Sequence, residues 1–232
     1  MPAGLPAEII IKRQFAMNGY FINILLNHSI LIPAIIGGIR FRSIAHAYYP
    51  FIFLMWLGLL NETLSLILIY TIRSNAVNSN IYVLIEYLVV LVQFYTWNNS
   101  FIKRYYFFAG LGLIVWIADN FLIHAINDNN SIFRIFYSFI IVFFSIDQIN
   151  KLIINERKSL IKNAVFLICS TFFIYYSCKA FVEVFNAFDL GLSNGFNRHV
   201  FMVLYFANVL SNIVYAIAIL CIPTKQEFTM PY

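Results

Sequence analysis

The sequence predicts an all-α, polytopic membrane bundle of seven transmembrane helices. Of its 232 residues, 62% are hydrophobic and only 11% are charged, whereas a soluble domain is about 25% charged. The apolar residues recur in runs of roughly 18 to 23, each long enough to cross a hydrocarbon core of about 30 Å as a helix. The runs follow one another closely, so we expect a single transmembrane domain over 1–232, with any chemistry inside the bundle.

Hydropathy places the seven predicted spans at about 20–39, 49–70, 81–99, 106–126, 132–150, 164–185 and 199–221. The first contains Pro33, which can kink a helix, and Gly37-Gly38, which allows close packing. Polar or basic segments separate the later spans and end the last one. In chain order they include RSNAVNSN, the Lys103-Arg104 pair, INDNN, the basic loop Lys151–Asn163, the polar loop Asn186–Asn197 and the tail CIPTKQEFTMPY.

Basic residues near the span ends predict the orientation, because cytoplasmic loops carry an excess of Lys and Arg. Nine lie on one side, namely Arg40, Arg42, Lys103, Arg104, Lys151, Arg157, Lys158, Lys162 and Lys225. Five lie on the other, namely Lys12, Arg13, Arg73, Arg134 and Arg198. The first group marks the cytoplasmic side, so the N-terminus is expected outside and the C-terminus in the cytoplasm. No cleavable signal peptide is expected, and a bacterial inner membrane is the predicted location.

Two turn segments resemble one another and suggest a repeat. Ser74–Asn78 and Ser193–Asn197 share the pattern S-N-x-x-N, and each follows an acid, Glu62 or Glu183, by about a dozen residues. Spans one to three and five to seven would then form parallel repeats joined by the fourth, a 3+1+3 arrangement found in small transporters. The alternative is chance similarity between two turns of an Asn-rich chain.

Five of the ten acids fall inside predicted spans: Glu62, Glu86, Asp119, Asp147 and Glu183. Each costs about 2.5–3.5 kcal/mol at a helix centre, so they should face the bundle interior, a wet cavity or a partner charge. Asp147 is expected near the cytoplasmic face. The other four fall in the middle or the outer half of the membrane.

Lys179, treated as the lone base within the spans, lies in the same outer half. It could pair with Glu183, one helical turn away, or with Glu62, Glu86 or Asp119 on neighbouring helices. We therefore predict an outward-opening polar pocket in which one lysine partly neutralises several carboxylates. The amide and phenol side chains expected to line it are Asn61, Asn120, Tyr175 and Tyr176.

Amides on the first and last spans have a structural and a functional interpretation. Asn208, Ser211, Asn212 and Tyr215 share one helical stripe, and such groups commonly form interhelical hydrogen bonds; Asn208 and Asn212 are also candidates for ligand binding. On the first span lie Asn23, Asn27 and His28. His28 could bind a proton or metal, although a histidine hydrogen-bonded inside a bundle is more usual.

Several classes of function lack their signatures. The basic residues sit in short connections, which favours headgroup contact over nucleic-acid binding. Cys169, Cys178 and Cys221 form no CxxC pair. Asp119 and His124 are five residues apart, and on an α-helix they would point in different directions, so no metal pair is expected. No GxSxG or HExxH motif occurs, and the last span lacks a lysine for retinal. We expect no cofactor or metal.

Three stretches, Asn78–Phe94, Lys162–Phe181 and Asn197–Cys221, resemble an uncharacterised group of small bacterial seven-helix membrane proteins. The resemblance covers most of the chain and is strongest around Glu86 in IEY and Asn212 in SNIVYAI. Genes of that group tend to lie beside genes for sensor histidine kinases, which implies a signalling role. The resemblance carries over no site residues.

Three hypotheses of function follow. The first is a receptor-like protein that binds a small or lipid-derived ligand in the outer pocket and couples, through the basic loop Lys151–Asn163 and the tail, to a cytoplasmic partner such as a histidine kinase. The second is a 3+1+3 transporter of small solutes, with Asp147 and Gln148 as its inner station. The third is an intramembrane lipid hydrolase with Glu62 and Asp119 as general acid and base.

Overall fold

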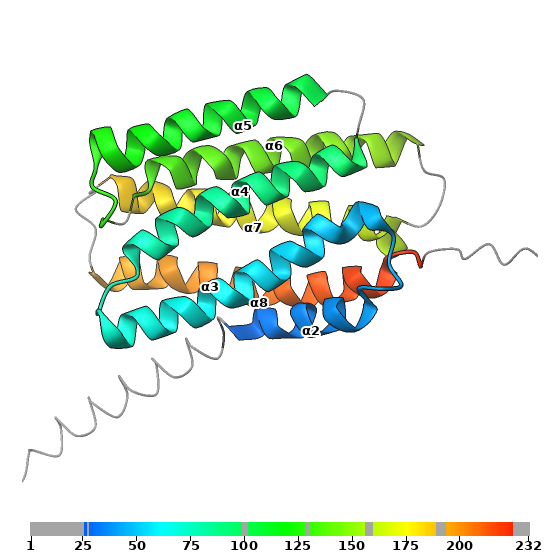
Figure 1. Ribbon diagram of the computed structural model, residues 1–232, viewed down its shortest axis with the longest axis horizontal. Coiled ribbons are helices and arrows are strands. Elements are labelled where there is room, and N and C mark those ends of the chain that lie inside the picture. Colours follow the sequence, from blue (N-terminus) through cyan, green and yellow to red (C-terminus); the bar gives the residue numbers. More distant parts are fainter. Residues whose placement is uncertain are drawn as a thin grey trace, which may run out of the picture.

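The structure is a computed structural model that describes residues 26, 28–98, 102–128, 130–155, 160–188 and 194–224, without the side chains of 155 and 194–199. The described residues form seven α-helices that run alternately in opposite directions (Figure 1). They are α2 (Leu31–Arg40), α3 (Tyr49–Thr71), α4 (Ala76–Trp97), α5 (Ile102–Ile117), α6 (Ile132–Asn155), α7 (Ala164–Ala187) and α8 (Asn194–Cys221). Shorter helical turns are η1 (His28–Ile30), η2 (His46–Tyr48), the π-helical η4 (Ala118–Ile123) and η5 (Leu160–Lys162).

Six of these helices, α3 to α8 with their attached turns, are long and apolar enough to cross a membrane. The remaining apolar helix, His28–Arg40, is shorter. It corresponds to the C-terminal part of the predicted span 20–39; residues 20–25 and 27, with Asn23 and Asn27, lie outside the described residues. The described residues thus form an all-helical membrane bundle with six long helices and one shorter helix.

Several helices end or begin away from the predicted span boundaries. Helix α4 begins at Ala76 and α8 at Asn194, each five residues before the predicted span, and α6 ends at Asn155, five residues after it. In α4 the reason is visible, because the polar first turns find partners inside the protein. Asn78 Nδ2 donates to Asn61 Oδ1 at 2.9 Å, and Asn80 Nδ2 donates to the carbonyl oxygens of Ile126 and Asp128 at 3.0 and 2.8 Å. The helix therefore continues beyond its hydrophobic part.

Five long helices surround the centre of the bundle. Contacts run from α3 to α4, α4 to α6, α6 to α7 and α7 to α8, and α2 packs against both α8 and α3 to complete the ring. Helix α5 lies outside this ring, against α4 and α6 (Figure 1). The ring places side chains from five different helices around one interior space.

The two ends of the bundle differ in composition. We call the end that carries residues 72–75 and 124–131 the Asn-rich end, and the end that carries residues 41–45 and the loop after α6 the basic end. The alternating helix directions put the connections after α3, α5 and α7 at the Asn-rich end and those after α2, α4 and α6 at the basic end (Figure 1). The predicted orientation rests on this division.

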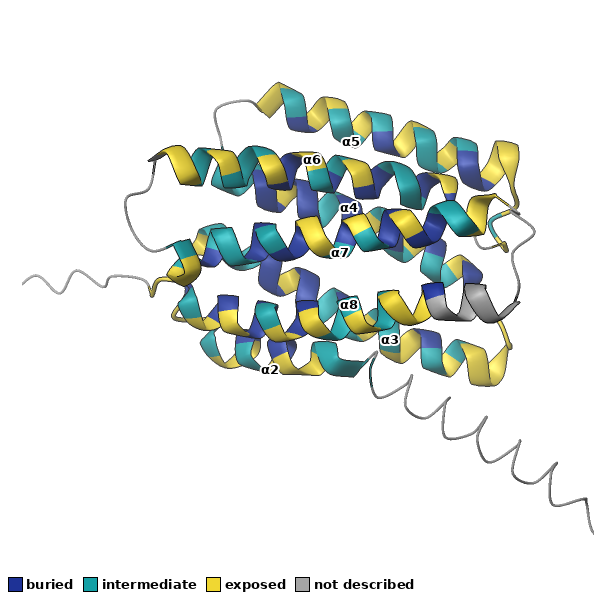
Figure 2. Ribbon diagram, turned by 180° about the vertical axis from the view of Figure 1, so that it is seen from behind, coloured by how far each residue is buried: buried dark blue, intermediate teal, exposed yellow. Residues whose placement is uncertain are grey.

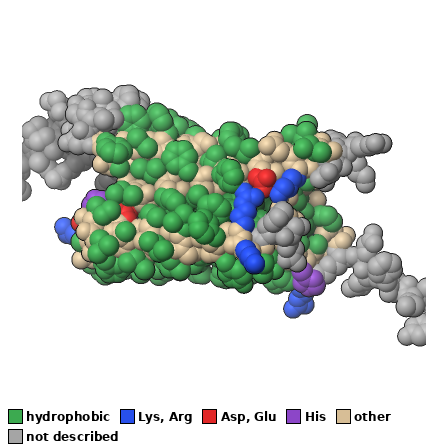
Figure 3. Space-filling model, turned by 90° about the horizontal axis from the view of Figure 1, so that it is seen from above, with side chains coloured by type: hydrophobic (Ala, Val, Ile, Leu, Met, Phe, Trp, Pro, Cys, Tyr) green, Lys and Arg blue, Asp and Glu red, His purple; other side chains and the backbone are tan. Residues whose placement is uncertain are grey.

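The outside of the bundle is apolar. Residues that face outward are mostly exposed, whereas those that face the centre are buried (Figure 2). Hydrophobic side chains cover most of the face shown in Figure 3, and charged side chains gather toward its two ends. Exposed Ile114, Phe139 and Leu210 are examples from three helices. A surface of this kind is suited to lipid, because acyl chains accept apolar side chains that water would not.

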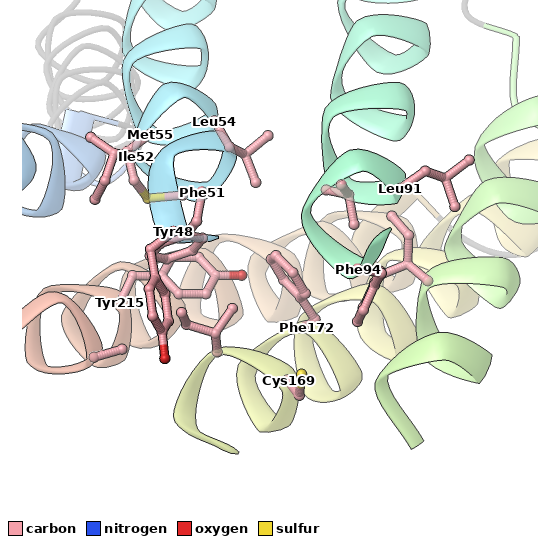
Figure 4. Packing of buried hydrophobic residues seen from close by; sticks show 14 of the residues in the cluster. Tyr48, Phe51, Ile52, Leu54, Met55, Leu91, Phe94, Cys169, Phe172 and Tyr215 are labelled. Carbon is pink, nitrogen blue, oxygen red and sulfur yellow. The ribbon is translucent and has the colours of Figure 1, made fainter. Parts of the chain in front are cut away.

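An aromatic cluster fills the half of the ring nearer the basic end. Phe51, Phe94, Phe172 and Tyr215 come from four helices and point toward one another (Figure 4). Their ring centroids lie 5.4 Å apart for Phe51 and Tyr215 and 6.0 Å apart for Phe94 and Phe172, mostly edge to face. Such edge-to-face pairs are favoured by the ring quadrupole.

The predicted 3+1+3 repeat depends on two similar turns, of which the structure describes the first fully and the second only in part. In the first, Asn78 bridges α4 to Asn61 and Ser65 of α3. In the second, Ser193 and the side chains of Asn194 and Asn197 lie outside the described residues. The repeat therefore stays a prediction.

Candidate functional site

A polar cavity occupies the half of the ring nearer the Asn-rich end. It has a volume of about 180 Å³ and is bounded by α3, α4, α6, α7, α8 and η1. Seven of the ten residues predicted to bind a ligand line it: Asn61, Glu62, Glu86, Tyr176, Lys179, Asn208 and Asn212. The structure thus brings together side chains from four helices that are far apart in the sequence.

Lys179 and Glu86 form the central ion pair of this cavity. Lys179 Nζ lies 3.2 Å from Glu86 Oε2, and both residues are buried, with 7% and 6% of their surface exposed. Glu86 also accepts hydrogen bonds from the hydroxyl groups of Tyr137, at 2.7 Å, and Tyr82, at 3.4 Å. Among the four acids considered, the partner of Lys179 is therefore Glu86.

Three tyrosine rings surround the ammonium group of Lys179. Its Nζ lies 5.0, 5.7 and 5.6 Å from the ring centroids of Tyr137, Tyr175 and Tyr176. At these distances the negative ring faces attract a cation. The rings and Glu86 together compensate for the loss of water around a buried lysine.

Arg134 is a second cation on the cavity wall, and sequence reasoning missed it. The sequence places it on the outer flank of the fifth span, whereas its side chain is largely buried and lines the cavity. Arg134 Nη1 lies 3.4 Å from Glu183 Oε1, and Nη2 donates to Ser79 Oγ at 2.8 Å and to Asn80 Oδ1 at 3.2 Å. Its position inside the predicted range 132–150 was the available signal, because an arginine at membrane depth requires partners.

Glu183 consequently does not pair with Lys179 on its own helix. Its Oε2 accepts hydrogen bonds from Ser131 Oγ at 2.7 Å and from Asn186 Nδ2 at 3.2 Å, while Oε1 faces Arg134. The picture of one lysine shared by several carboxylates is wrong. Two cations each hold one acid, and these pairs join α4 to α7 and α6 to α7.

Glu62 differs from both of these acids. It lines the cavity and is only partly buried, and within the part of the chain that the structure describes no hydrogen bond or ion pair holds its carboxylate. The charged groups within electrostatic range of it are His28, Lys179 and Glu86. Its surroundings are polar, as predicted from its place among apolar residues, but the carboxylate itself is available to a ligand or to water.

The amides of the site have structural roles as well. Asn61 Oδ1 accepts from Asn78 Nδ2, which links α3 to α4. Asn212 Nδ2 donates to Ser29 Oγ at 2.8 Å, which links α8 to η1, and lies 3.5 Å from Asn208 Oδ1 one turn earlier. The expected interhelical hydrogen bonding of the last span is therefore present at Asn212.

Asp119 and Asn120, which were predicted to share the pocket, are not among the residues that line this cavity. Asp119 is completely buried, and its Oδ2 accepts a hydrogen bond from the backbone N–H of Phe133 at 2.7 Å in the first turn of α6. Asn120 Nδ2 donates to Trp116 O, and its Oδ1 accepts from Asn130 Nδ2 at 2.9 Å. Both residues fasten the end of α5 to the start of α6.

Asp119 and His124 also point toward each other, contrary to expectation. Asp119 Oδ1 lies 2.8 Å from His124 Nδ1, although five residues separate them. The expectation assumed an α-helix, but residues Ala118–Ile123 form a π-helical turn, in which the i→i+5 hydrogen bond brings such residues onto one face. The His124 N–H to Asp119 O hydrogen bond of 3.1 Å shows this geometry directly.

Asp147 lies at the other end of the bundle, near the basic end, which is the end predicted to face the cytoplasm. Its Oδ2 is 2.9 Å from Lys151 Nζ and 3.3 Å from Arg104 Nη1, and the guanidinium group stacks 4.6 Å above the ring of Phe144. Asp147 is not among the residues that line the cavity. The acids of the described residues therefore do not all line one cavity.

The described residues show neither a cluster of metal ligands nor a disulfide bond. Among the residues that the structure describes, no group of three or more His, Cys, Asp or Glu side chains is arranged to hold a metal ion. The three cysteines are free. Glu62 and Asp119, the pair considered for general acid and base catalysis, lie in separate environments.

Comparison with models of known protein families, with curated proteins and with solved structures finds no match to this chain. The similarity to seven-helix proteins encoded beside histidine kinases stays a prediction, and the function must be argued from the site.

Proposed function

We propose that the chain is a receptor-like protein of the bacterial inner membrane that binds a small ligand in the polar cavity and signals to a cytoplasmic partner. The observation that supports this most is the form of the cavity. It is polar, it contains a carboxylate without a protein partner among the described residues, and it ends on an aromatic cluster toward the basic end. Such a chamber holds a ligand without offering it a polar route onward.

The walls of the cavity suggest how binding could move helices. The Lys179–Glu86 pair joins α7 to α4, and the Arg134–Glu183 pair joins α7 to α6. A ligand that pairs with one of these four charged side chains would weaken the ion pair to which that side chain belongs. The contact between the two helices joined by that pair would weaken, and the other contact of α7 would become the stronger of the two. Helix α7 begins at the basic end, so a small shift of this helix is felt at that end.

The basic end provides the surface for lipids and for a partner. Arg42 is exposed, and Lys103 lies on an exposed part of α5. In the proposed orientation these cations contact anionic headgroups and an acidic surface of a signalling partner such as a histidine kinase. The chain has no output domain among its described helices, which is why coupling to a second protein belongs to the proposal.

The experiment uses the full chain in lipid nanodiscs. Thermal unfolding is followed in the presence of a panel of small amines, carboxylates, zwitterions and sugars, and each solute that stabilises the protein is then tested with Glu62→Gln. The proposal predicts stabilisation by one chemical class, lost in the variant. It also predicts that a fluorophore on a cysteine introduced at Arg42 reports that solute's binding, because the shift must reach the basic end.

The same solute separates the other two hypotheses. If it accumulates inside sealed vesicles in a Glu62-dependent way, the chain is a transporter and the receptor proposal fails. If the solute or a lipid is chemically consumed, the chain is an enzyme. Binding without accumulation or turnover, together with the change at position 42, supports the receptor.

A further inference from the structure

We propose that the ligand of the cavity is a zwitterionic group, an ammonium next to an anionic oxygen, as in a small amino acid or a phosphoethanolamine headgroup. This inference rests on the proposed ligand site and specifies what fits it. It depends on two observations: the charged side chains of the cavity and their ion-pair partners include one carboxylate more than cations, and one hydrogen-bond donor of Arg134 has no acceptor within the described residues.

The charge balance leaves one acid over. Lys179 is held by Glu86 at 3.2 Å and Arg134 by Glu183 at 3.4 Å, so each cation already has its carboxylate. Glu62 is the third carboxylate of the group; His28 and Lys179 lie within electrostatic range of it, but no hydrogen bond or ion pair holds it within the described residues. Because an unpaired charge in a low-dielectric site is costly, the cavity favours a ligand that brings a positive group to Glu62.

The surroundings of Glu62 suit an ammonium group. Tyr82 and Tyr175 both line the cavity and lie within electrostatic range of the Glu62 carboxylate. Tyrosine rings attract cations through their faces, and their hydroxyl groups can accept N–H hydrogen bonds. The cavity already uses this chemistry once, around the ammonium group of Lys179.

The unused donor belongs to Arg134. Its two terminal nitrogens bond to Glu183, Ser79 and Asn80, but its Nε is buried and has no hydrogen-bond partner within the described residues. A buried donor without an acceptor is destabilising by about 1–3 kcal/mol, and most such groups in proteins find a partner. A ligand oxygen placed against Arg134 would provide it.

The size of the cavity limits what can enter. At about 180 Å³ it is smaller than the roughly 300–1,000 Å³ sites that hold drug-sized ligands. It therefore takes a small solute or the headgroup of a lipid whose acyl chains stay outside, between helices. Two groups of opposite sign on its wall select a molecule that carries both charges.

The test measures binding by isothermal titration calorimetry of the full chain in phosphatidylglycerol nanodiscs. The soluble probes are glycine, L-alanine and O-phosphoethanolamine, with ethylamine and acetate as single-charge controls. A second series of nanodiscs contains phosphatidylethanolamine, whose occupation of the cavity would reduce binding of the soluble probes. Binding of the soluble zwitterions points to a solute, and competition by the lipid points to a headgroup; both support the proposal.

Two variants test the two charges separately. Glu62→Gln should weaken zwitterion binding about tenfold or more, because it removes a charged hydrogen-bond acceptor. Arg134→Lys keeps a positive charge for Glu183 but lacks the Nε donor, and should weaken binding of zwitterions without affecting ethylamine. Asp128→Asn, an exposed acid at the same end of the bundle, is the matched control and should leave binding unchanged.

The outcomes distinguish this inference from the proposed function. If only ethylamine or only acetate binds, or if Glu62→Gln binds zwitterions normally, the zwitterion proposal is overturned while a receptor for another ligand stands. If zwitterions bind as expected but also accumulate in vesicles, the ligand class is right and the receptor proposal fails. If none of the probes binds to a chain that unfolds cooperatively, the zwitterion proposal is wrong.

Discussion

At the scale of single residues, the ion pairs of the cavity carry most of the consequences. Glu86 accepts hydrogen bonds from two tyrosine hydroxyl groups in addition to Lys179, so it has three polar partners, as Glu183 has. Arg134 is nearly as well satisfied by its neighbours, apart from Nε. These groups behave as a preformed polar core, and Glu62 is the member of it that is left open to a ligand.

Removing Lys179 should be strongly destabilising. Lys179→Met leaves Glu86 buried without its counter-charge, and breaking a buried pair typically costs about 3–5 kcal/mol. The double variant Lys179→Met/Glu86→Gln should recover much of this loss, because no charge is then left unpaired. Unfolding in mixed micelles measures both variants. Equal stability of the single variant and the wild type would show that Lys179 is solvated and not part of the core.

Glu183→Gln should be less costly than Lys179→Met. Ser131 and Asn186 can still donate to the amide oxygen, and Arg134 retains Ser79 and Asn80. The reason that the sequence alone offers for this ranking, that Lys179 is the sole cation, does not hold, since Arg134 shares that role. The ranking follows instead from the number of partners each side chain keeps.

At the scale of elements, the contact between α4 and α5 depends on a glycine. A Cβ added at Gly112 would overlap Tyr87 Cε1 and lie 2.9 Å from Cζ, and Tyr87 is completely buried with its hydroxyl donated to Phe108 O at 2.7 Å. The ring has little room to move. Among the long helices that the structure describes, α5 packs mainly on α4 and α6, so this contact is a large part of what holds it.

Gly112→Ala should therefore destabilise the protein by about 1–3 kcal/mol, the usual range for an overpacked core. Gly110→Ala is the matched control, since it lies two residues away on the same helix with no atom within 4 Å of the added Cβ. It should be neutral or slightly stabilising, because alanine favours a helix. Unfolding of each variant in detergent measures the two effects. Equal effects at both positions would contradict the close contact of α5 with Tyr87.

The junction of α5 and α6 depends on Asp119. Asp119→Ala removes the acceptor of the Phe133 N–H and the partner of His124, and should destabilise by about 1–3 kcal/mol. Asp119→Asn keeps one acceptor oxygen and should lose less. Neither should change zwitterion affinity by more than about twofold. Loss of zwitterion binding in a stable Asp119→Asn protein would show that Asp119 contributes to the ligand site.

At the scale of the whole molecule, the ring of helices separates two chemical environments. The polar cavity and the two ion pairs, Lys179–Glu86 and Arg134–Glu183, lie toward the Asn-rich end, and the aromatic cluster of Figure 4 lies toward the basic end. Closely packed aromatic rings transmit displacement rather than absorb it. In the proposed receptor, the binding site would lie at one end and a rigid core would lead to the other.

The orientation of this molecule in the membrane is open to direct measurement. With the three native cysteines replaced, a cysteine at Asp128 should react with a membrane-impermeant maleimide in intact cells, because the Asn-rich end is expected outside. A cysteine at Arg42 should react only after permeabilisation. The reverse pattern would invert the bundle and place the cavity toward the cytoplasm, where it could not receive an external ligand.

Several features of the site could be predicted from the sequence because they follow from the cost of burying charge. Glu62, Glu86 and Lys179 had to face the interior, and they do line one cavity. Asp147 had to lie near the basic end, and it does. What failed were statements about partners. The spacing of Lys179 and Glu183 allowed an ion pair that Arg134 in fact prevents by binding Glu183.

Asp119 and His124 show the second kind of failure. Their relation was predicted from α-helical geometry, but a local π turn changes which residues share a face. Nothing in the hydropathy of this segment distinguishes a π turn from an α turn.

The sequence by itself determined that this chain forms apolar helices, roughly where they begin and end, and which side chains cannot face lipid. Those properties depend on the composition of each segment and on the free energy of transferring it from water. Only the tertiary structure decided that α5 lies outside the ring, that Glu86 holds Lys179, and that Glu62 is left without a partner among the described residues. These depend on the arrangement of helices in three dimensions, because charges on separate helices choose partners by distance, which the order of residues along the chain does not specify.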